Sequence, residues 1–203
     1  MKSGHAIPRW AGGLMLIGLL AAPASRRLLE AQMATHMLVQ IPLLALTGVL
    51  FASAIGARMR RSLEPYNEHG LPGMLAVLFA SSYWMLPRAL DAALDSAAME
   101  VIKFLSLPLL VGLPLALSWP RVGPVGKGFV LANAVSMIGV IGWLYRQSPV
   151  RLCNYYLIDQ QILLGDCLLG LALLMGLACT ARAFVGPRGV PRVGRLLDDA
   201  RAH

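Results

Sequence analysis

The chain has few charged residues and few cysteines for its length, and each shortage excludes a class of protein. Charged residues make up 14% of the 203 residues, whereas soluble domains usually contain about a quarter. A single soluble domain is therefore the weaker interpretation. The three cysteines, Cys153, Cys167 and Cys179, have no paired spacing and match neither a zinc finger nor a disulfide framework. Cys167 and Cys179 fall in an apolar block, where cysteine usually packs as a small hydrophobe, and Cys153 is the candidate for exposure.

The signatures of enzymes and of nucleic-acid-binding proteins are also missing. The sequence contains no HExxH motif, no glycine-rich phosphate loop and no nucleophile–base pair. It contains no zinc-finger or RNA-binding signature. The net charge of +8 does not change this, because the basic residues lie in short segments between apolar blocks, as loop charges of membrane proteins do. We therefore expect neither an enzyme nor a nucleic-acid-binding protein.

Apolar residues, by contrast, are abundant and grouped. They make up 57% of the chain, and the mean hydropathy is +0.65. They form six blocks of a length comparable to the roughly 20 residues that a helix needs to cross a bilayer: residues 10–24, 34–55, 72–90, 98–119, 129–145 and 156–184. The pattern predicts an all-α integral membrane bundle of about six transmembrane helices over residues 1–184, followed by a basic tail over residues 185–203.

The first apolar block allows two interpretations. Lys2 and Arg9 precede it and the segment "LAAPAS" follows it, which are features of a cleaved signal peptide. The next block follows after a short link, however, and this favours a retained first helix that serves as a membrane span.

The lysines and arginines predict the orientation of the chain. Twelve fall on one side of the predicted membrane: Lys2, Arg9, Arg58, Arg60, Arg61, Arg121, Lys127, Arg182, Arg188, Arg192, Arg195 and Arg201. Six fall on the other: Arg26, Arg27, Arg88, Lys103, Arg146 and Arg151. The side richer in basic residues is usually cytoplasmic. We expect a multi-pass protein of a bacterial-type inner membrane with both termini in the cytoplasm and the tail as an anchor of this topology.

A first group of candidate ligands lies in "QMATHMLVQIPLL". Met33, His36, Met37 and Gln40 are three or four residues apart and share one broad helix face. Thioether sulfur and neutral imidazole suit copper(I), which is a soft ion. The alternative is that the methionines face lipid or fill the core and that His36 makes one hydrogen bond between helices.

A second group lies in "YWMLPRALD", which, like His36, falls at the non-cytoplasmic side of the predicted membrane. Tyr83 and Trp84 are typical of the membrane interface. Pro87 is expected to end or kink the helix, because proline lacks an N–H group. Met85 offers a further sulfur, although an aromatic belt followed by a helix stop explains the segment equally well.

A third group lies in "NYYLIDQQILLGD". Asp159 and Asp166 are seven residues apart and share a face of one helix. Asp159 is expected near the interface, where it favours the helix N-terminus. Asp166 lies about two turns deeper, so we expect it to be buried and to need a partner, with Lys103, Asn133 or protonation as the options. The two glutamines between these aspartates are expected to bond across helices.

In order along the chain, these stretches resemble the CtaG type of cytochrome c oxidase assembly factors. "ATHMLVQIPLLAL" is similar to the family's "HM-x-QH-x-LL", and "YWMLPRALDAAL" to its "WH-x-P-x-x-x-D-x-A". "EVIKFLSLPLLVG" resembles "EH-x-x-F" loosely, and "DQQILLGDCLLGL" resembles the closing "DQQ-x-x-G". The likeness covers residues 30–180. It implies a multi-helix membrane protein linked to copper insertion into haem-copper oxidases.

The chain also departs from the family's pattern. His36 matches the first family histidine, but the second falls near residues 39–40, where histidine is absent. Met85 stands in place of the histidine after tryptophan, and Val101 in place of the histidine after Glu100. The family usually has seven helices. A histidine-rich copper site of the family's kind cannot be complete here.

We therefore carry three hypotheses forward. The first is copper handling or assembly of a haem-copper oxidase, with an oxidase subunit as partner. Its predicted copper ligands are His36, Met85, Met33, Met37 and Met99, with Cys153 as a further option, supported by Gln40, Trp84, Asp159, Gln160, Gln161 and Asp166. The second is a non-metal membrane scaffold of a respiratory or other complex. The third is a small proton-coupled transporter that uses Asp166, which the lack of an internal repeat weakens. A monomer and a dimer remain equally compatible with the sequence.

Overall fold

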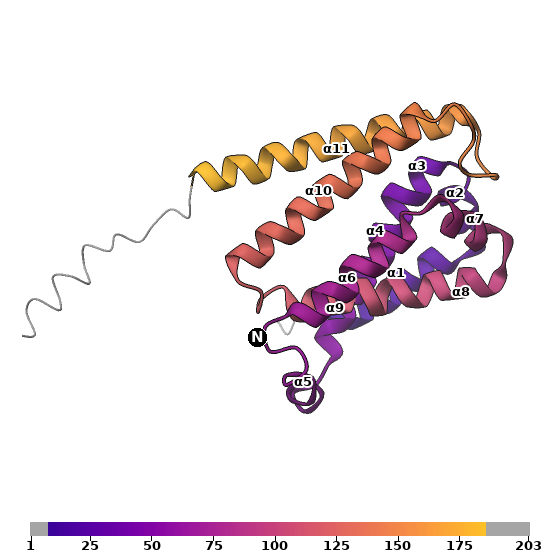
Figure 1. Cartoon of the computed structure of the whole chain (residues 1–203). Coiled ribbons are helices and arrows are strands. Elements are labelled where there is room, and N and C mark those ends of the chain that lie inside the picture. Colours follow the sequence, from indigo (N-terminus) through magenta and orange to yellow (C-terminus); the bar gives the residue numbers. More distant parts are fainter. Residues whose placement is uncertain (1–7, 186–203) are drawn as a thin grey trace, which may run out of the picture.

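The computed structural model describes residues 8–185, and all regular structure within this range is helical. The elements before the first large loop are α1 (Arg9–Ala21), α2 (Pro23–Leu29), α3 (Met33–Thr35), the π-helical turn η1 (His36–Gln40), α4 (Ile41–Phe51), the 3₁₀ turn η2 (Ala52–Ala54) and α5 (Ala57–Leu63). They are followed by α6 (Leu71–Trp84), α7 (Pro87–Asp95), α8 (Ala97–Ser106), the π-helical turn η3 (Leu107–Gly112), α9 (Leu113–Ser118), α10 (Pro124–Gln147) and α11 (Ile158–Val185). The predicted all-α bundle is confirmed (Figure 1).

Within residues 8–185, four continuous helices are long and apolar enough to cross a membrane. They cover Met33–Ala54, Ala97–Ser118, Pro124–Gln147 and Ile158–Phe184. α1 and α2 form a fifth span if the pair is counted as one, although the chain bends by 71° between them. α6 has 14 residues, so it is about 21 Å long, shorter than a bilayer core of about 30 Å. All six predicted blocks are helical, and the chain is a multi-pass membrane protein. The predicted tail lies outside the described residues except for residue 185.

Two of the spans contain π-helical turns next to prolines. η1 ends two residues before Pro42, and η3 contains Pro108. Proline cannot donate the backbone hydrogen bond of a regular α-helix, and an i→i+5 turn is one way to accommodate the mismatch. In η1 the wider turn carries His36 and Gln40, and both side chains are fully buried.

These two spans also pack backbone against backbone. A Cβ atom on Gly48 of α4 would overlap the carbonyl oxygen of Pro108, and one on Gly112 of η3 would overlap the carbonyl oxygen of Ala45. Small residues allow this close approach of membrane helices. The two glycines therefore fix the position of η1 relative to α8, the helix that lies directly before η3.

The remaining long helices, α10 and α11, form a hairpin in which Gly142 faces Gly165. Figure 1 shows this hairpin beside the other helices, and α11 contacts them through α3. The loop of the hairpin, residues 148–157, lies at the same end of the molecule as α2, α3 and α7 (Figure 1). We call this end, formed by residues 23–40, 87–103 and 148–161, the outer end. It gathers the segments that the sequence analysis assigned to one side of the membrane.

Candidate functional site

A lysine forms the centre of the outer end. Lys103 lies on α8 within a membrane span, and its side chain is fully buried. Its ammonium group donates three hydrogen bonds: to Glu30 Oε1 at 2.9 Å, to His36 Nε2 at 3.1 Å and to Gln40 Oε1 at 3.1 Å. An ammonium group has three N–H donors and no acceptor. Every donor of Lys103 is therefore used inside the protein.

These contacts determine the tautomer of His36. Because the lysine ammonium only donates, Nε2 of His36 accepts, and the proton of the neutral ring is on Nδ1. Nδ1 then donates to the hydroxyl of Tyr156 at 2.8 Å, and this hydroxyl donates to the carbonyl oxygen of Glu30 at 3.0 Å. Gln40 closes the set by donating to Glu30 Oε1 at 2.9 Å. We call Glu30, His36, Gln40, Lys103 and Tyr156 the Lys103 network.

The charge of the lysine is balanced within the network. Glu30 forms an ion pair with Lys103, and the side chains are 13% and 1% exposed. Burial raises the pKa of the Glu30 carboxyl, but hydrogen bonds from Lys103 and Gln40 outweigh it, so this pKa lies below 4.5. A second ion pair, between Arg26 and Glu100, lies beside the first. An ammonium ion inside a membrane span is costly unless it is paired and fully hydrogen-bonded, and this network meets both conditions.

The lowered pKa of Glu30 predicts how stability depends on pH. A carboxyl whose pKa is lower in the folded than in the unfolded protein stabilises the fold fully above the unfolded value of about 4.5 and loses this contribution as the pH falls through the folded value. We expect the thermal midpoint of the wild type to exceed that of E30Q at neutral pH and the gap to close in acid. Thermal unfolding of both proteins in detergent from pH 7 to pH 3 measures this difference between the midpoints. A gap that is unchanged over this range contradicts the assignment.

The predicted sulfur ligands divide into two groups. Met33 and Met37 are buried in one core cluster, where Met85 packs against them. Cys153 belongs to the same cluster and is buried, so the prediction that it is exposed is wrong. Burial is the main cause that raises the pKa of the Cys153 thiol to about 12, and the negative charge of the nearby Asp91 is the smaller cause. Met99 packs against a different core cluster.

His36 does not fit the copper site predicted from the sequence. Copper(I) would need the lone pair of Nε2, and this lone pair accepts a hydrogen bond from Lys103. The other ring nitrogen is bonded to Tyr156. A copper ion on Nε2 would also lie next to an ammonium group that is held at 3.1 Å from the same nitrogen. The alternative interpretation, in which His36 bonds between helices, agrees with this geometry.

The residues predicted to support the ligands differ in burial and in their hydrogen-bond partners. Gln40 belongs to the Lys103 network. Trp84 is buried and donates to Ser106 Oγ at 2.9 Å, so its side chain faces the bundle. Asp159 is exposed in the first turn of α11, as predicted. Gln160 is half-buried, and its Oε1 atom has no partner.

Asp166 is not buried among the helices, and this prediction is wrong. Its side chain is 45% exposed and forms an ion pair with Arg146 of α10, so neither Lys103 nor Asn133 is its partner. Lys103, which falls within the predicted block 98–119, lies inside α8 and is fully buried. Cys167, on the same helix as Asp166, is exposed rather than packed as a small buried hydrophobe.

Gln161 fixes the hairpin loop. Its amide nitrogen donates to the carbonyl oxygen of Tyr145 at 3.1 Å, and its Oε1 accepts from the backbone N–H of Leu152 at 2.8 Å. The adjacent loop residues bind α7: the N–H of Asn154 donates to Asp91 and the hydroxyl of Tyr155 donates to Asp95, each at 2.8 Å. The loop therefore holds Tyr156 in the Lys103 network.

We expect Gln161→Leu to loosen this loop, whereas Gln160→Leu, at the neighbouring position, should not. Gln161→Leu leaves the partly buried N–H of Leu152 and the buried carbonyl of Tyr145 without the partners that they have now, at a cost of about 1–3 kcal/mol. Amide hydrogen exchange of residues 148–157 measures the effect. Equal exchange in the two variants contradicts the role given to Gln161.

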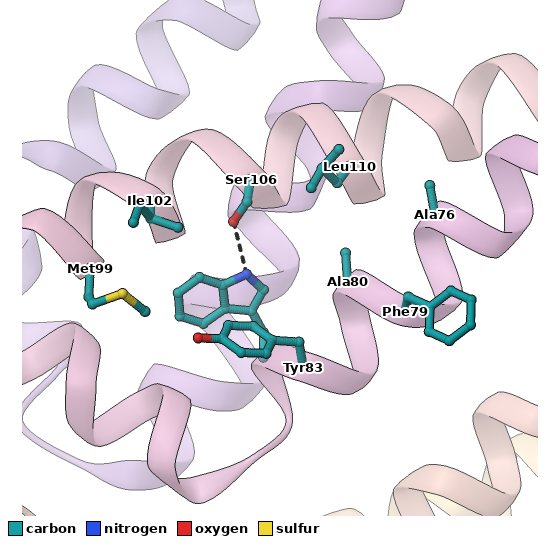
Figure 2. A pocket seen from close by; sticks show the side chains of 9 residues that line it. Ala76, Phe79, Ala80, Tyr83, Met99, Ile102, Ser106 and Leu110 are labelled. Atoms are coloured by element: carbon teal, nitrogen blue, oxygen red, sulfur yellow. Dashed lines mark hydrogen bonds between the residues drawn. The ribbon is translucent and has the colours of Figure 1, made fainter.

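A groove opens on the side of the bundle between α6 and α8–η3 (Figure 2). Its volume is about 480 Å³. Ala76, Phe79 and Ala80 line it from α6, and Met99 and Ile102 from α8. Figure 2 also shows the bond from the indole N–H of Trp84 to Ser106, which uses the polar atom of the indole. The lining offers little to a polar ligand.

Three members of the Lys103 network were absent from the predicted site: Glu30, Lys103 and Tyr156. Lys103 carried a signal, because a charge within an apolar block of membrane length is a candidate for function. Nothing in the sequence marked Glu30 or Tyr156 as part of a site, since each lies in a loop and comes close to His36 only in the folded chain.

Comparison of the chain with protein-family models, with curated proteins and with solved structures finds no match in any of the three. The likeness to the CtaG type therefore rests on the sequence stretches alone.

Proposed function

We propose that the protein is a membrane scaffold in the assembly of a haem-copper respiratory oxidase and does not carry copper on His36. The Lys103 network supports the scaffold role. It joins the end of α2, the turn η1, helix α8 and the hairpin loop, and it leaves no donor of Lys103 for an external ligand. A scaffold needs a surface of fixed shape, and this network holds four segments of the outer end together.

The client and the location are inferred from the sequence. The likeness over residues 30–180 indicates a haem-copper oxidase, and the uneven distribution of lysine and arginine indicates an inner membrane with cytoplasmic termini. In this orientation the outer end faces the periplasm. The polar side chains of Asp91, Asp95 and Tyr155 then lie on the surface that an oxidase subunit would meet.

Removal of the gene from its natural host tests the proposal. Membranes without the protein should lose most of their haem-copper oxidase, measured by haem difference spectra, while other respiratory complexes stay at their normal level. The wild-type gene should restore the oxidase. His36→Gln, which keeps hydrogen-bonding groups but offers no imidazole, should restore it as well. A normal oxidase level without the protein contradicts the proposal.

A second candidate function is copper(I) handling by sulfur ligands, favoured by one observation. Met33, Met37, Met85 and Cys153 belong to the same core cluster, and thioether and thiolate sulfur are the preferred ligands of copper(I). Replacement of Met37 and Met85 by leucine, which keeps the apolar volume, should then abolish copper(I) binding. The matched change of Met99, in the other cluster, should not. The transporter hypothesis has no such support, since Asp166 is paired with Arg146.

A further inference from the structure

Three lone pairs from one short segment point at a single position. Glu30 Oε1, His36 Nε2 and Gln40 Oε1 lie 2.9, 3.1 and 3.1 Å from Lys103 Nζ. An ammonium nitrogen is tetrahedral, with three N–H bonds and one bond to the Cε carbon. Its three N–H bonds serve these three acceptors, and the lysine side chain takes up the remaining direction.

This set of atoms is of the kind that binds divalent transition metals. A carboxylate oxygen and an imidazole nitrogen are common ligands of Zn²⁺, and many zinc sites combine three protein ligands with one open position. An amide oxygen can complete such a set, and the carboxylate supplies negative charge. The arrangement found around Nζ thus corresponds to a three-ligand metal site with the lysine in place of the ion.

Contacts other than those with Lys103 also hold the three ligand atoms in place. Glu30, His36 and Gln40 belong to one stretch of eleven residues, and Lys103 comes from a different helix. Gln40 donates directly to Glu30 at 2.9 Å, and His36 is held by Tyr156 at 2.8 Å. Neither bond involves the lysine side chain.

We propose that residues 30–40 form a cation site whose resident cation is the ammonium group of Lys103, and that shortening this side chain opens the site to a divalent metal ion of the Zn²⁺ class. Zinc–ligand distances are about 2.0–2.2 Å, so each ligand atom moves inward by about 0.9 Å. Rotations of the Glu30 and Gln40 side chains supply this movement. Glu30 is 13% exposed, which gives the ion a way in from the outer end.

The test uses Zn²⁺ and the full-length protein in detergent. Lys103→Ala, purified without metal, should have a lower thermal midpoint than the wild type. Addition of Zn²⁺ should raise this midpoint and load about one ion per chain, because an ion that binds only the folded state stabilises it. The wild type should show neither effect, since its own ammonium group fills the site.

Two double variants serve as controls. Zinc should not raise the midpoint of H36A/K103A, which lacks the imidazole nitrogen, or of E30Q/K103A, which lacks the negative charge of the carboxylate. E30Q/K103A also lacks the unpaired carboxylate and should therefore fold without metal. Three results would overturn the proposal: no zinc response of K103A, an equal response of the double variants, or a K103A chain that folds neither with zinc nor without it. Zinc bound stoichiometrically by the wild type through His36 would overturn it too.

Discussion

Lys103→Met is expected to lower the free energy of unfolding by about 3–5 kcal/mol, the range for breaking a buried ion pair by removing one partner. Methionine has nearly the same length and fills the same apolar path, so the loss reports on the charge and its hydrogen bonds. Glu30, His36 and Gln40 would each lose a partner in a place that water hardly reaches. Thermal unfolding of the purified protein in detergent measures the effect.

The double variant E30Q/K103M separates the ion pair from other causes. It removes both charges together and leaves Gln40 and residue 30 as neutral amide partners. It should therefore be more stable than K103M, although it contains one more substitution. If the two losses simply add, Glu30 and Lys103 are not coupled, and the Lys103 network does not hold the outer end together.

Gly112→Leu is expected to have the second large effect. The side chain would meet the backbone of α4 at Ala45, and a backbone segment cannot move aside as a flexible side chain can. Overpacking of a well-packed core usually costs about 1–3 kcal/mol, and a backbone clash exceeds this range. We expect the span that begins at Met33 and the span that begins at Ala97 to separate, and the network with them. Folded yield and thermal midpoint measure this.

Gly170→Leu on α11 is the matched control. No atom lies within 4 Å of a Cβ added there, so this change introduces the same side chain without a clash. It should leave the thermal midpoint close to that of the wild type. Equal losses in the two variants would mean that the close contact between α4 and η3 does not determine the packing of these spans.

The sequence predicts the helical class of this protein well, for a physical reason. A membrane span needs a long apolar run, and such runs are visible without any knowledge of contacts. All six predicted blocks are helical. The lengths of the helices were less predictable. The block predicted over residues 72–90 is interrupted, since α6 ends at Trp84 and the chain turns before Pro87, a residue type that is disfavoured inside a helix.

The site was only partly predictable. Helical spacing predicts that Met33, His36 and Met37 share one face, because residues three and four apart do so. The structure shows that this face is the buried one. The partners of His36 were not predictable, since Lys103 and Tyr156 are 67 and 120 residues away in the chain. Asp166 was misjudged because depth along a helix does not tell which side of the helix faces the bundle.

The most direct test of the account is the copper(I) content of the protein purified from copper-supplied cells under reducing conditions, with the wild type and His36→Gln measured side by side. Because the ammonium group of Lys103 occupies the lone pair of His36 Nε2, we predict the same copper content in both proteins. Stoichiometric copper in the wild type that disappears in His36→Gln would contradict it, and would show that Lys103 gives way to a metal ion in the native protein.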